Sequence, residues 1–248
     1  MMNKWLCIIT TLMFLAGCNS EDGGKPLLSF DVSGHWQVSI DTGDEFEPLQ
    51  TIVVDPEGRF MGTDGENTLV GRDADSLKLD GKGVSGSGVV CNEDGDEPLG
   101  FSCNEVSFNL VIEDDDHLVG SATFVVEPTS ISVDVKLERL KELDVDIDDP
   151  ELYGSWESVN GTGTTLQVNS DLTFTAEHAN GDGAEGQYSK ESANIYSVEG
   201  AASYDGTEVA ITGLGFFDAD GQLTIGVSAE LDGNVFATGD LYQSIKFE

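Results

Sequence analysis

Residues 34–40 read Gly-His-Trp-Gln-Val-Ser-Ile, and they decide how the chain is interpreted. The apolar side chains in this stretch are Trp36, Val38 and Ile40, and polar ones alternate with them. A period of two is typical of a β-strand that buries one face and exposes the other to water. We therefore predict a half-buried strand here.

The same alternation recurs along the rest of the chain, at residues 106–112, 122–126, 131–138, 223–231 and 235–241. Short segments rich in Gly, Asp and Asn separate these runs, as in residues 55–58 (Asp-Pro-Glu-Gly) and 218–221 (Asp-Ala-Asp-Gly). Such residues favour tight turns between hairpin strands. The pattern predicts an all-β chain with antiparallel strands.

The two halves of the chain share an order of parts. Gly34-His35-Trp36 opens the first half, and Gly154-Ser155-Trp156 opens the second. We interpret three features as repeated: this opening, a Phe just after the first hairpin turn (Phe60 and Phe174), and a closing strand with Ser-Ile (residues 130–131 and 244–245). The order predicts a tandem duplication. The alternative is chance similarity between two β-domains.

Residues 137–150 separate the halves. Leu137, Leu140 and Leu143 have helical spacing, which indicates either a short helix or an extension of the preceding strand. We expect the Asp-rich run that follows, together with Pro150, to end that element. The boundary is placed near residue 147, which gives domains at residues 30–147 and 148–248.

Each half holds about eight candidate strands, and a meander of that size protects its edges best by closing into a barrel. Gly-x-Trp in the first strand resembles the opening signature of lipocalin-like barrels, in which the Trp lies at the floor. The resemblance implies two tandem up-and-down β-barrels. The Arg that packs on this Trp from a late strand is not evident, and Arg139 is the last Arg of the chain. A β-sandwich is the alternative fold.

The first eighteen residues, MMNKWLCIITTLMFLAGC, are typical of an export signal with one early Lys and a short apolar run. Leu15-Ala16-Gly17-Cys18 resembles a bacterial lipobox. The resemblance implies a signal peptide at residues 1–17 and a Cys18 that carries diacylglycerol and a further acyl chain such as palmitate. Asn19 then implies the outer membrane, facing either side, with residues 18–29 as a tether. A plain secretory signal is the alternative.

Two further cysteines, Cys91 and Cys103, lie in the first half. An even pair in an exported domain predicts a disulfide. It would close a loop of about a dozen residues and contribute roughly 3 kcal/mol in the loop-entropy description. A metal site is the alternative, but no His lies near in the sequence.

The chain has 248 residues, with 47 Asp and Glu against 11 Lys and Arg, and a formal net charge of −36 at pH 7. A chain so acidic cannot neutralise phosphates, which excludes nucleic acid as a partner. The same charge repels anionic lipid headgroups.

Motifs for catalysis or cofactor binding are absent from the sequence. The histidines, His35, His117 and His178, are isolated from one another, and we interpret each as a surface strand residue. The Gly-rich residues 81–88 lack the Gly-Lys-Ser/Thr ending of a phosphate loop, and the acidic runs at 113–116 and 144–149 do not match a calcium loop. We expect no metal and no cofactor.

These observations predict a lipid-anchored outer-membrane lipoprotein that is not an enzyme and binds a small apolar ligand or an envelope component. Barrel interiors hold such ligands, and Trp36 and Trp156 are the candidate contacts. One alternative is an acidic barrel that binds or inhibits a cationic protein such as lysozyme. Another is a hydrolase with two carboxylates in one cleft.

Overall fold

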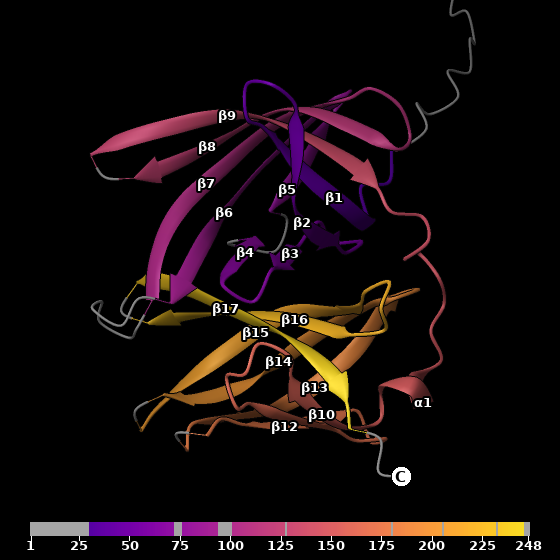
Figure 1. The fold of residues 1–248 in the computed structure, drawn as a ribbon, viewed down its shortest axis with the longest axis vertical. Coiled ribbons are helices and arrows are strands. Elements are labelled where there is room, and N and C mark those ends of the chain that lie inside the picture. Colours follow the sequence, from indigo (N-terminus) through magenta and orange to yellow (C-terminus); the bar gives the residue numbers. More distant parts are fainter. Residues whose placement is uncertain are drawn as a thin grey trace, which may run out of the picture. The chain divides into compact units, whose positions relative to one another are not determined.

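The computed structural model describes residues 30–71, 76–93, 101–126, 128–179, 181–204, 206–231 and 233–245 (Figure 1). The predicted signal peptide and tether, with Cys18, lie outside these residues. Residues Val32–Glu248 form one compact unit that holds all the described strands. In the described part of the chain, no helix is long and apolar enough to cross a membrane.

The first barrel is a meander of antiparallel strands. Its strands are β1 (Gly34–Asp41), β2 (Phe46–Val54), β3 (Phe60–Thr63), β4 (Asn67–Gly71), β5 (Leu77–Asp80), β6 (Gly83–Glu93), β7 (Phe101–Ile112), β8 (His117–Val126) and β9 (Thr129–Arg139). The sheet runs in the order β4-β3-β2-β1-β9-β8-β7-β6 and closes because β4 also pairs with β6. β5 pairs with the other end of β6 and is an addition to the ring.

The second barrel closes in strict chain order. After a one-turn helix, α1 (Asp149–Leu152), come β10 (Gly154–Ser158), β11 (Thr165–Val168), β12 (Thr173–Glu177), β13 (Gly183–Ser192), β14 (Ile195–Tyr204), β15 (Thr207–Phe217), β16 (Leu223–Leu231) and β17 (Asn234–Ser244). β10 pairs with both β11 and β17. The prediction of two tandem up-and-down barrels of eight strands is therefore confirmed, and the sandwich alternative is wrong.

The first strand of each barrel meets the last strand at a tryptophan. Trp36 pairs with Arg139 of β9, and Trp156 pairs with Ser244 of β17. Ser244 therefore occupies the place of Arg139. The predicted equivalence of the two Ser-Ile pairs was wrong. Residues 130–131 lie at the start of β9, whereas Ser244 lies at the end of β17. Two residues with no chemical likeness are equivalent, and only the pairing reveals it.

Arg139 is the arginine that the sequence did not reveal. Its guanidinium lies 4.4 Å from the centroid of the Trp36 ring, and Nη1 donates to the carbonyl of Ser33 at 2.6 Å. A planar cation over an indole face adds a cation–π attraction. The first barrel therefore has the Trp–Arg pair of the lipocalin-like signature. The second barrel has Ser244 in that place and lacks it.

Both tryptophans are anchored in the same way. The indole Nε1 of Trp36 donates to the carbonyl of Val32 at 2.9 Å, and that of Trp156 donates to Leu152 at 3.0 Å. Gly34 and Gly154 have φ of 124° and 137°, a backbone conformation that side chains with a Cβ rarely adopt. The Gly of Gly-x-Trp is thus required by the chain's entry into each barrel.

The first hairpin turn is also repeated. Val54 pairs with Phe60 and Val168 pairs with Phe174 across the turn. Two residues before each Phe, the backbone is left-handed, with φ of 79° at Gly58 and 68° at Leu172. Among the described residues, Leu172 is the non-glycine residue with positive φ. The second turn has therefore kept a conformation that suits glycine while carrying an exposed leucine.

The segment between the barrels differs from the prediction. β9 continues through Leu137 to Arg139, so the strand-extension alternative holds for this leucine. Pro150 does not end an element. It occupies the first turn of α1, where its missing N–H costs no hydrogen bond.

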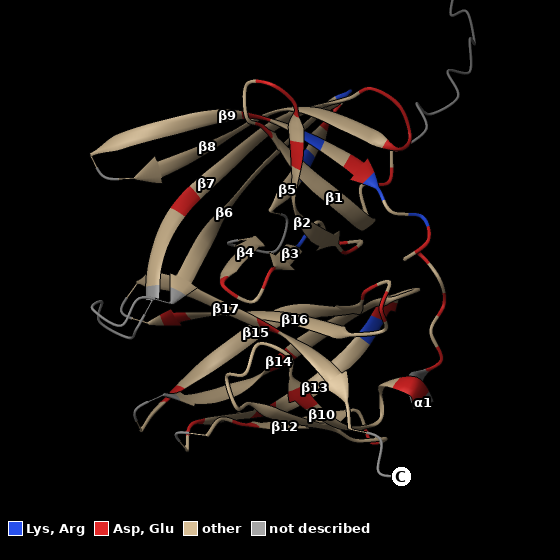
Figure 2. Ribbon diagram, viewed as in Figure 1, with Lys and Arg blue, Asp and Glu red and all other residues tan. Residues whose placement is uncertain are grey.

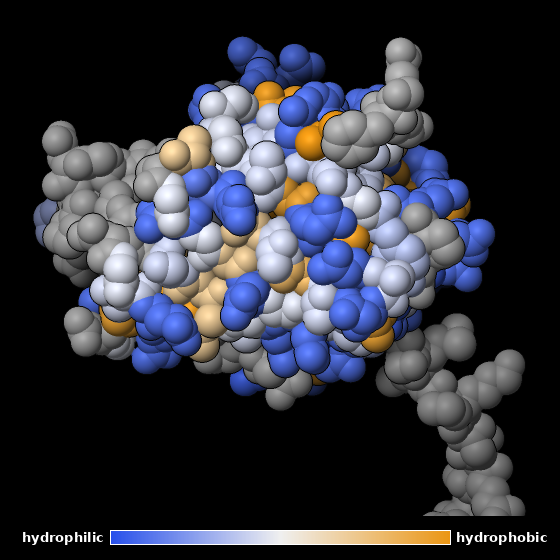
Figure 3. Space-filling model, turned by 90° about the horizontal axis from the view of Figure 1, so that it is seen from below, coloured by the Kyte–Doolittle hydropathy of each residue, from blue (hydrophilic) through white to orange (hydrophobic). Residues whose placement is uncertain are grey.

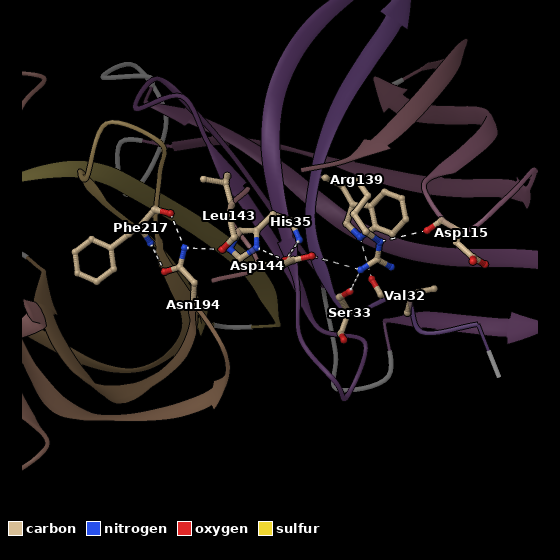
Figure 4. A network of polar contacts seen from close by, with 10 residues as sticks. Val32, Ser33, His35, Asp115, Arg139, Leu143, Asp144, Asn194 and Phe217 are labelled. Carbon is tan, nitrogen blue, oxygen red and sulfur yellow. Dashed lines mark hydrogen bonds and ion pairs between the residues drawn. The ribbon is translucent and has the colours of Figure 1, made fainter. Parts of the chain in front are cut away.

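Polar contacts fix this segment to both barrels (Figure 4). Asp144 lies 2.7 Å from Nδ1 of His35 and 3.7 Å from Nη1 of Arg139. Asn194, at the start of β14, donates to the carbonyls of Leu143 and Phe217 and accepts from the N–H of Phe217. The connecting segment is therefore tied to β1 on one side and to the β13–β14 turn on the other.

Outward-facing apolar side chains of the two barrels form a shared core. One cluster joins Val53, Met61, Val70, Val89 and Cys91 of the first barrel with Ile195, Leu214, Phe216 and Ala237 of the second. It explains why some strands are apolar on both faces. In β2, Ile52 and Val54 point into the barrel, while Val53, between them, belongs to the shared core.

His35 belongs to this interface. It is fully buried, and its ring packs edge-on against Phe216, with the ring centroids 5.2 Å apart. The interpretation of His35 as a surface residue was wrong. Its strand face is the outer face of the first barrel, but the second barrel covers it.

Cys91 and Cys103 form the predicted disulfide, at paired positions of β6 and β7. Cys91 is buried in the shared core, and its sulfur accepts a hydrogen bond from the N–H of Ala237 in β17 at 3.2 Å. The disulfide therefore links β6 to β7 at the place where this hairpin of the first barrel contacts the second barrel.

Acidic residues greatly outnumber basic ones. Asp and Glu are spread over the loops and over some strand positions of both barrels, and Lys and Arg are few (Figure 2). Among the described acidic residues, Asp55 and Asp240 are buried. The face seen in Figure 3 shows a strip of hydrophobic surface framed by hydrophilic side chains.

Leu172→Gly is expected to stabilise the protein by about 1 kcal/mol, because a left-handed conformation costs an L-residue about 1–2 kcal/mol and glycine much less. Urea unfolding would measure it. The matched change, Gly58→Ala, should destabilise the protein by a similar amount, since its new Cβ would also lie 3.0 Å from the Leu77 carbonyl. Equal unfolding midpoints for L172G and the unchanged chain would show that the left-handed conformation of Leu172 carries no strain.

Reduction of the Cys91–Cys103 disulfide is expected to lower the free energy of unfolding by about 3 kcal/mol, since it frees a loop with a sequence separation of 12. Urea unfolding with and without a phosphine reductant measures the loss. The double variant Cys91→Ala/Cys103→Ala is the control and should not respond to reductant. An unchanged midpoint for the reduced chain would show that the bond does not contribute.

Candidate ligand cavity of the second barrel

The two barrels differ in their interiors. The second encloses a cavity of about 500 Å³, within the range of small-molecule sites. In the first, the void between Trp36, Phe60 and Phe108 is about 20 Å³, too small for an organic ligand. The described cavity with room for a ligand therefore lies in the second barrel.

The register explains the difference. Ile112 pairs with Leu118 in the first barrel as Phe217 pairs with Leu223 in the second, which makes β7 and β15 equivalent. Counting back along each strand, Phe108 and Leu110 of β7 correspond to Gly213 and Gly215 of β15. Two large inward side chains of the filled barrel are thus replaced by glycines, and Gly215 lines the cavity.

A side chain from outside the ring, together with two aromatic rings of ring strands, also fills the first barrel. Leu77 of β5 lines its small void, as do Phe60 and Phe108, whose rings pack edge-to-face with centroids 5.6 Å apart. The second barrel has no counterpart of β5 among its described strands. Alanines line its cavity instead, at Ala176, Ala184 and Ala202.

The floor of the cavity is aromatic. Tyr188, Tyr196 and Phe217 pack against one another, with neighbouring ring centroids 6.3 to 6.4 Å apart. The hydroxyl of Tyr188 donates to the carbonyl of Asn169 at 2.9 Å. These contacts fix the rings, and Tyr188 and Tyr196 line the cavity while Phe217 lies in the core below.

Polar residues lie at the other end of the barrel. Thr162 and Thr164 come from the β10–β11 loop, His178 and Asp182 from the β12–β13 turn, and Asp240 from β17. Gly65, in the β3–β4 turn of the first barrel, also lines the cavity. The apolar wall thus ends in a polar rim to which both barrels contribute.

Asp240 is the buried carboxylate of this rim, with 8% of its surface exposed. Oδ1 accepts from Asn160 Nδ2 at 3.0 Å and from the backbone N–H of Leu241 at 2.8 Å. Oδ2 accepts from the Thr162 hydroxyl at 2.9 Å. All three donors are neutral, so they solvate the carboxylate without cancelling its charge.

The charge of Asp240 acts on the cavity wall. Tyr242 lies two residues further along β17, on the same face, and lines the cavity. Burial and then the nearby charge of Asp240 raise the pKa of the Tyr242 phenol far above its usual range. Tyr242 is therefore held as a neutral phenol even in alkaline solution, able to donate a hydrogen bond.

The tryptophans predicted as ligand contacts lie elsewhere. Trp36 is fully buried beside the small void of the first barrel. Trp156 belongs to the core of the second barrel and packs against Phe217, with the ring centroids 5.7 Å apart. It is not among the residues that line the described cavity. Tyr188, Tyr196 and Tyr242, which sequence reasoning did not single out, line it instead.

The hydrolase alternative requires two carboxylates in one cleft. Asp182 and Asp240 both line the cavity, and this pair is where that alternative would have to act. Among the described residues, no group of three or more His, Cys, Asp or Glu is placed to hold a metal ion. Of the other isolated histidines, His117 lies near the surface and His178 lines the cavity rim.

Comparison with known proteins adds little to this geometry. No family model matches the chain, and no curated protein is similar to it. Among solved structures, the chain is similar to a crystal structure from Bacteroides fragilis that is provisionally described as an outer membrane protein. The two have 13% sequence identity and a TM-score of 0.27, over 86% of this chain and 98% of that chain.

Proposed function

We propose that the chain is a binding protein for a small apolar molecule, held in the second barrel. The observation that carries the proposal is the cavity of about 500 Å³ with an apolar wall and a polar rim. Sites for small molecules combine these two features, because apolar area supplies affinity and a few polar groups fix orientation. The first barrel then serves as a filled support.

In this proposal the first barrel has a structural role. The first barrel buries the outer face of β15 and β17 in the shared core, where Leu214, Phe216 and Ala237 lie. Gly215 and Phe217, on the opposite face of β15, belong to the cavity wall and floor. Packing on the outer face therefore holds the strand that forms the inner one.

We further propose that the protein is anchored to the outer membrane through a lipid on Cys18, as the lipobox resemblance implies. Several acyl chains would hold it essentially permanently, since each buried CH₂ contributes about 0.8 kcal/mol. A cationic protein partner is the second candidate function, supported by the net charge of −36.

Narrowing the cavity is expected to weaken ligand binding. Ala184→Leu puts a larger apolar side chain on the cavity wall, so the fluorescence titration of Nile red, a neutral apolar dye, should show at least about tenfold weaker binding. Ala210→Leu is the matched control, because Ala210 is an exposed residue of β15 and the same atoms are added outside the barrel. Equal binding by the two variants, or no binding by the unchanged chain, would contradict the proposed function.

Cys18→Ser is expected to release the protein from the membrane fraction and to abolish incorporation of radiolabelled palmitate. Export in a Gram-negative host, followed by membrane fractionation and labelling, measures both. Cys91→Ser, at a disulfide position, is the control for general loss of a cysteine and should leave labelling unchanged. Labelling that persists in the Cys18 variant would show that the lipid is attached elsewhere.

A further inference from the structure

We infer that the cavity of the second barrel selects an apolar ligand with a cationic head, such as an alkylammonium group, and rejects fatty acids and other anionic amphiphiles. The inference rests on the proposed function and adds the charge of the ligand to it. It is carried by the position and the partners of Asp240.

The carboxylates of Asp182 and Asp240 line the cavity together with the imidazole of His178. No Lys or Arg is among its described lining residues. A carboxylate ligand would enter a low-dielectric space beside a fixed carboxylate, where repulsion is stronger than in water. An ammonium group in the same place would be attracted.

Asp240 replaces an apolar residue of the filled barrel. Leu118 pairs with Leu137 in the first barrel as Leu223 pairs with Tyr242 in the second, so β9 and β17 are equivalent. Val135, two residues before Leu137, therefore corresponds to Asp240. Val135 is buried in the filled interior, whereas the hollow barrel has a carboxylate at this place.

That carboxylate has no cation beside it in the described structure. Its partners are the Asn160 amide, the Thr162 hydroxyl and a backbone N–H, and none of the described Lys or Arg side chains forms an ion pair with it. Burying a charge without a counter-charge is costly. A cationic ligand head would supply the missing charge.

An aromatic ring close to Asp240 adds a second attraction for a cation. Tyr242, two residues further along β17 on the same face, lines the cavity, and tyrosine faces attract ammonium groups within about 6 Å. Lys190 lies 5.9 Å from the Tyr196 ring centroid and is not among the residues that line the cavity. Its charge is taken up by Asp146, 2.6 Å away.

The test compares three probes with the same chain and different heads: decylammonium, decanol and decanoate. Each displaces Nile red from the purified full chain in detergent-free, low-salt buffer, below its micelle concentration. Decylammonium should displace the dye at a concentration at least about tenfold lower than decanoate, with decanol between them. Decanoate that competes as well as decylammonium would overturn the inference while leaving the proposed function intact.

The source of the selectivity is tested with Asp240→Asn, which keeps the shape and the hydrogen-bonding capacity of the side chain. The ratio between decylammonium and decanoate should fall to about threefold or less. Asp134→Asn, on an exposed position of β9, changes the net charge equally and should leave the ratio unchanged. Equal effects of the two variants would overturn the role of Asp240.

The comparison of the three probes on the unchanged chain does not depend on how the variants fold. If Nile red itself does not bind, both the proposed function and this inference fail. If Nile red binds and none of the three probes displaces it, the proposed function stands and the alkylammonium ligand is excluded.

Discussion

Each barrel depends on the pairing of its first strand with its last, and a tryptophan lies at that seam. Trp36 and Trp156 are buried there, and each indole is tied to a carbonyl four residues earlier. The seam fixes which residues of the last strand face inward, because a shift by one residue would turn every side chain to the other face. The interior of each barrel follows from it.

With the seam in common, the two interiors have diverged. Equivalent positions hold Phe108 and Leu110 in one barrel and Gly213 and Gly215 in the other. Packed interiors leave few voids larger than a water molecule, so a loss of two large side chains leaves space that neighbours do not fill. The two barrels thus have the same order of ring strands, but the interior of one is filled and the interior of the other holds a cavity.

The two barrels pack against each other. They share a core of outward-facing side chains, and the Cys91–Cys103 disulfide and His35 both lie in it. Such a core stabilises the outer face of the strands that form the cavity wall. Its apolar contacts also hold together the two halves of a chain whose formal net charge is −36.

The sequence by itself determined the all-β class, the eight-strand meanders, the disulfide and the turns, because strand alternation and turn residues act over a few neighbours. It did not reveal the equivalence of Arg139 with Ser244, the burial of His35, or the cavity around Tyr188, Tyr196 and Tyr242. Each of these depends on which strands lie opposite one another, and the strands concerned are far apart in the chain. The tertiary structure alone decided that one barrel is filled and the other hollow, because a missing side chain is visible only against the register of its neighbours.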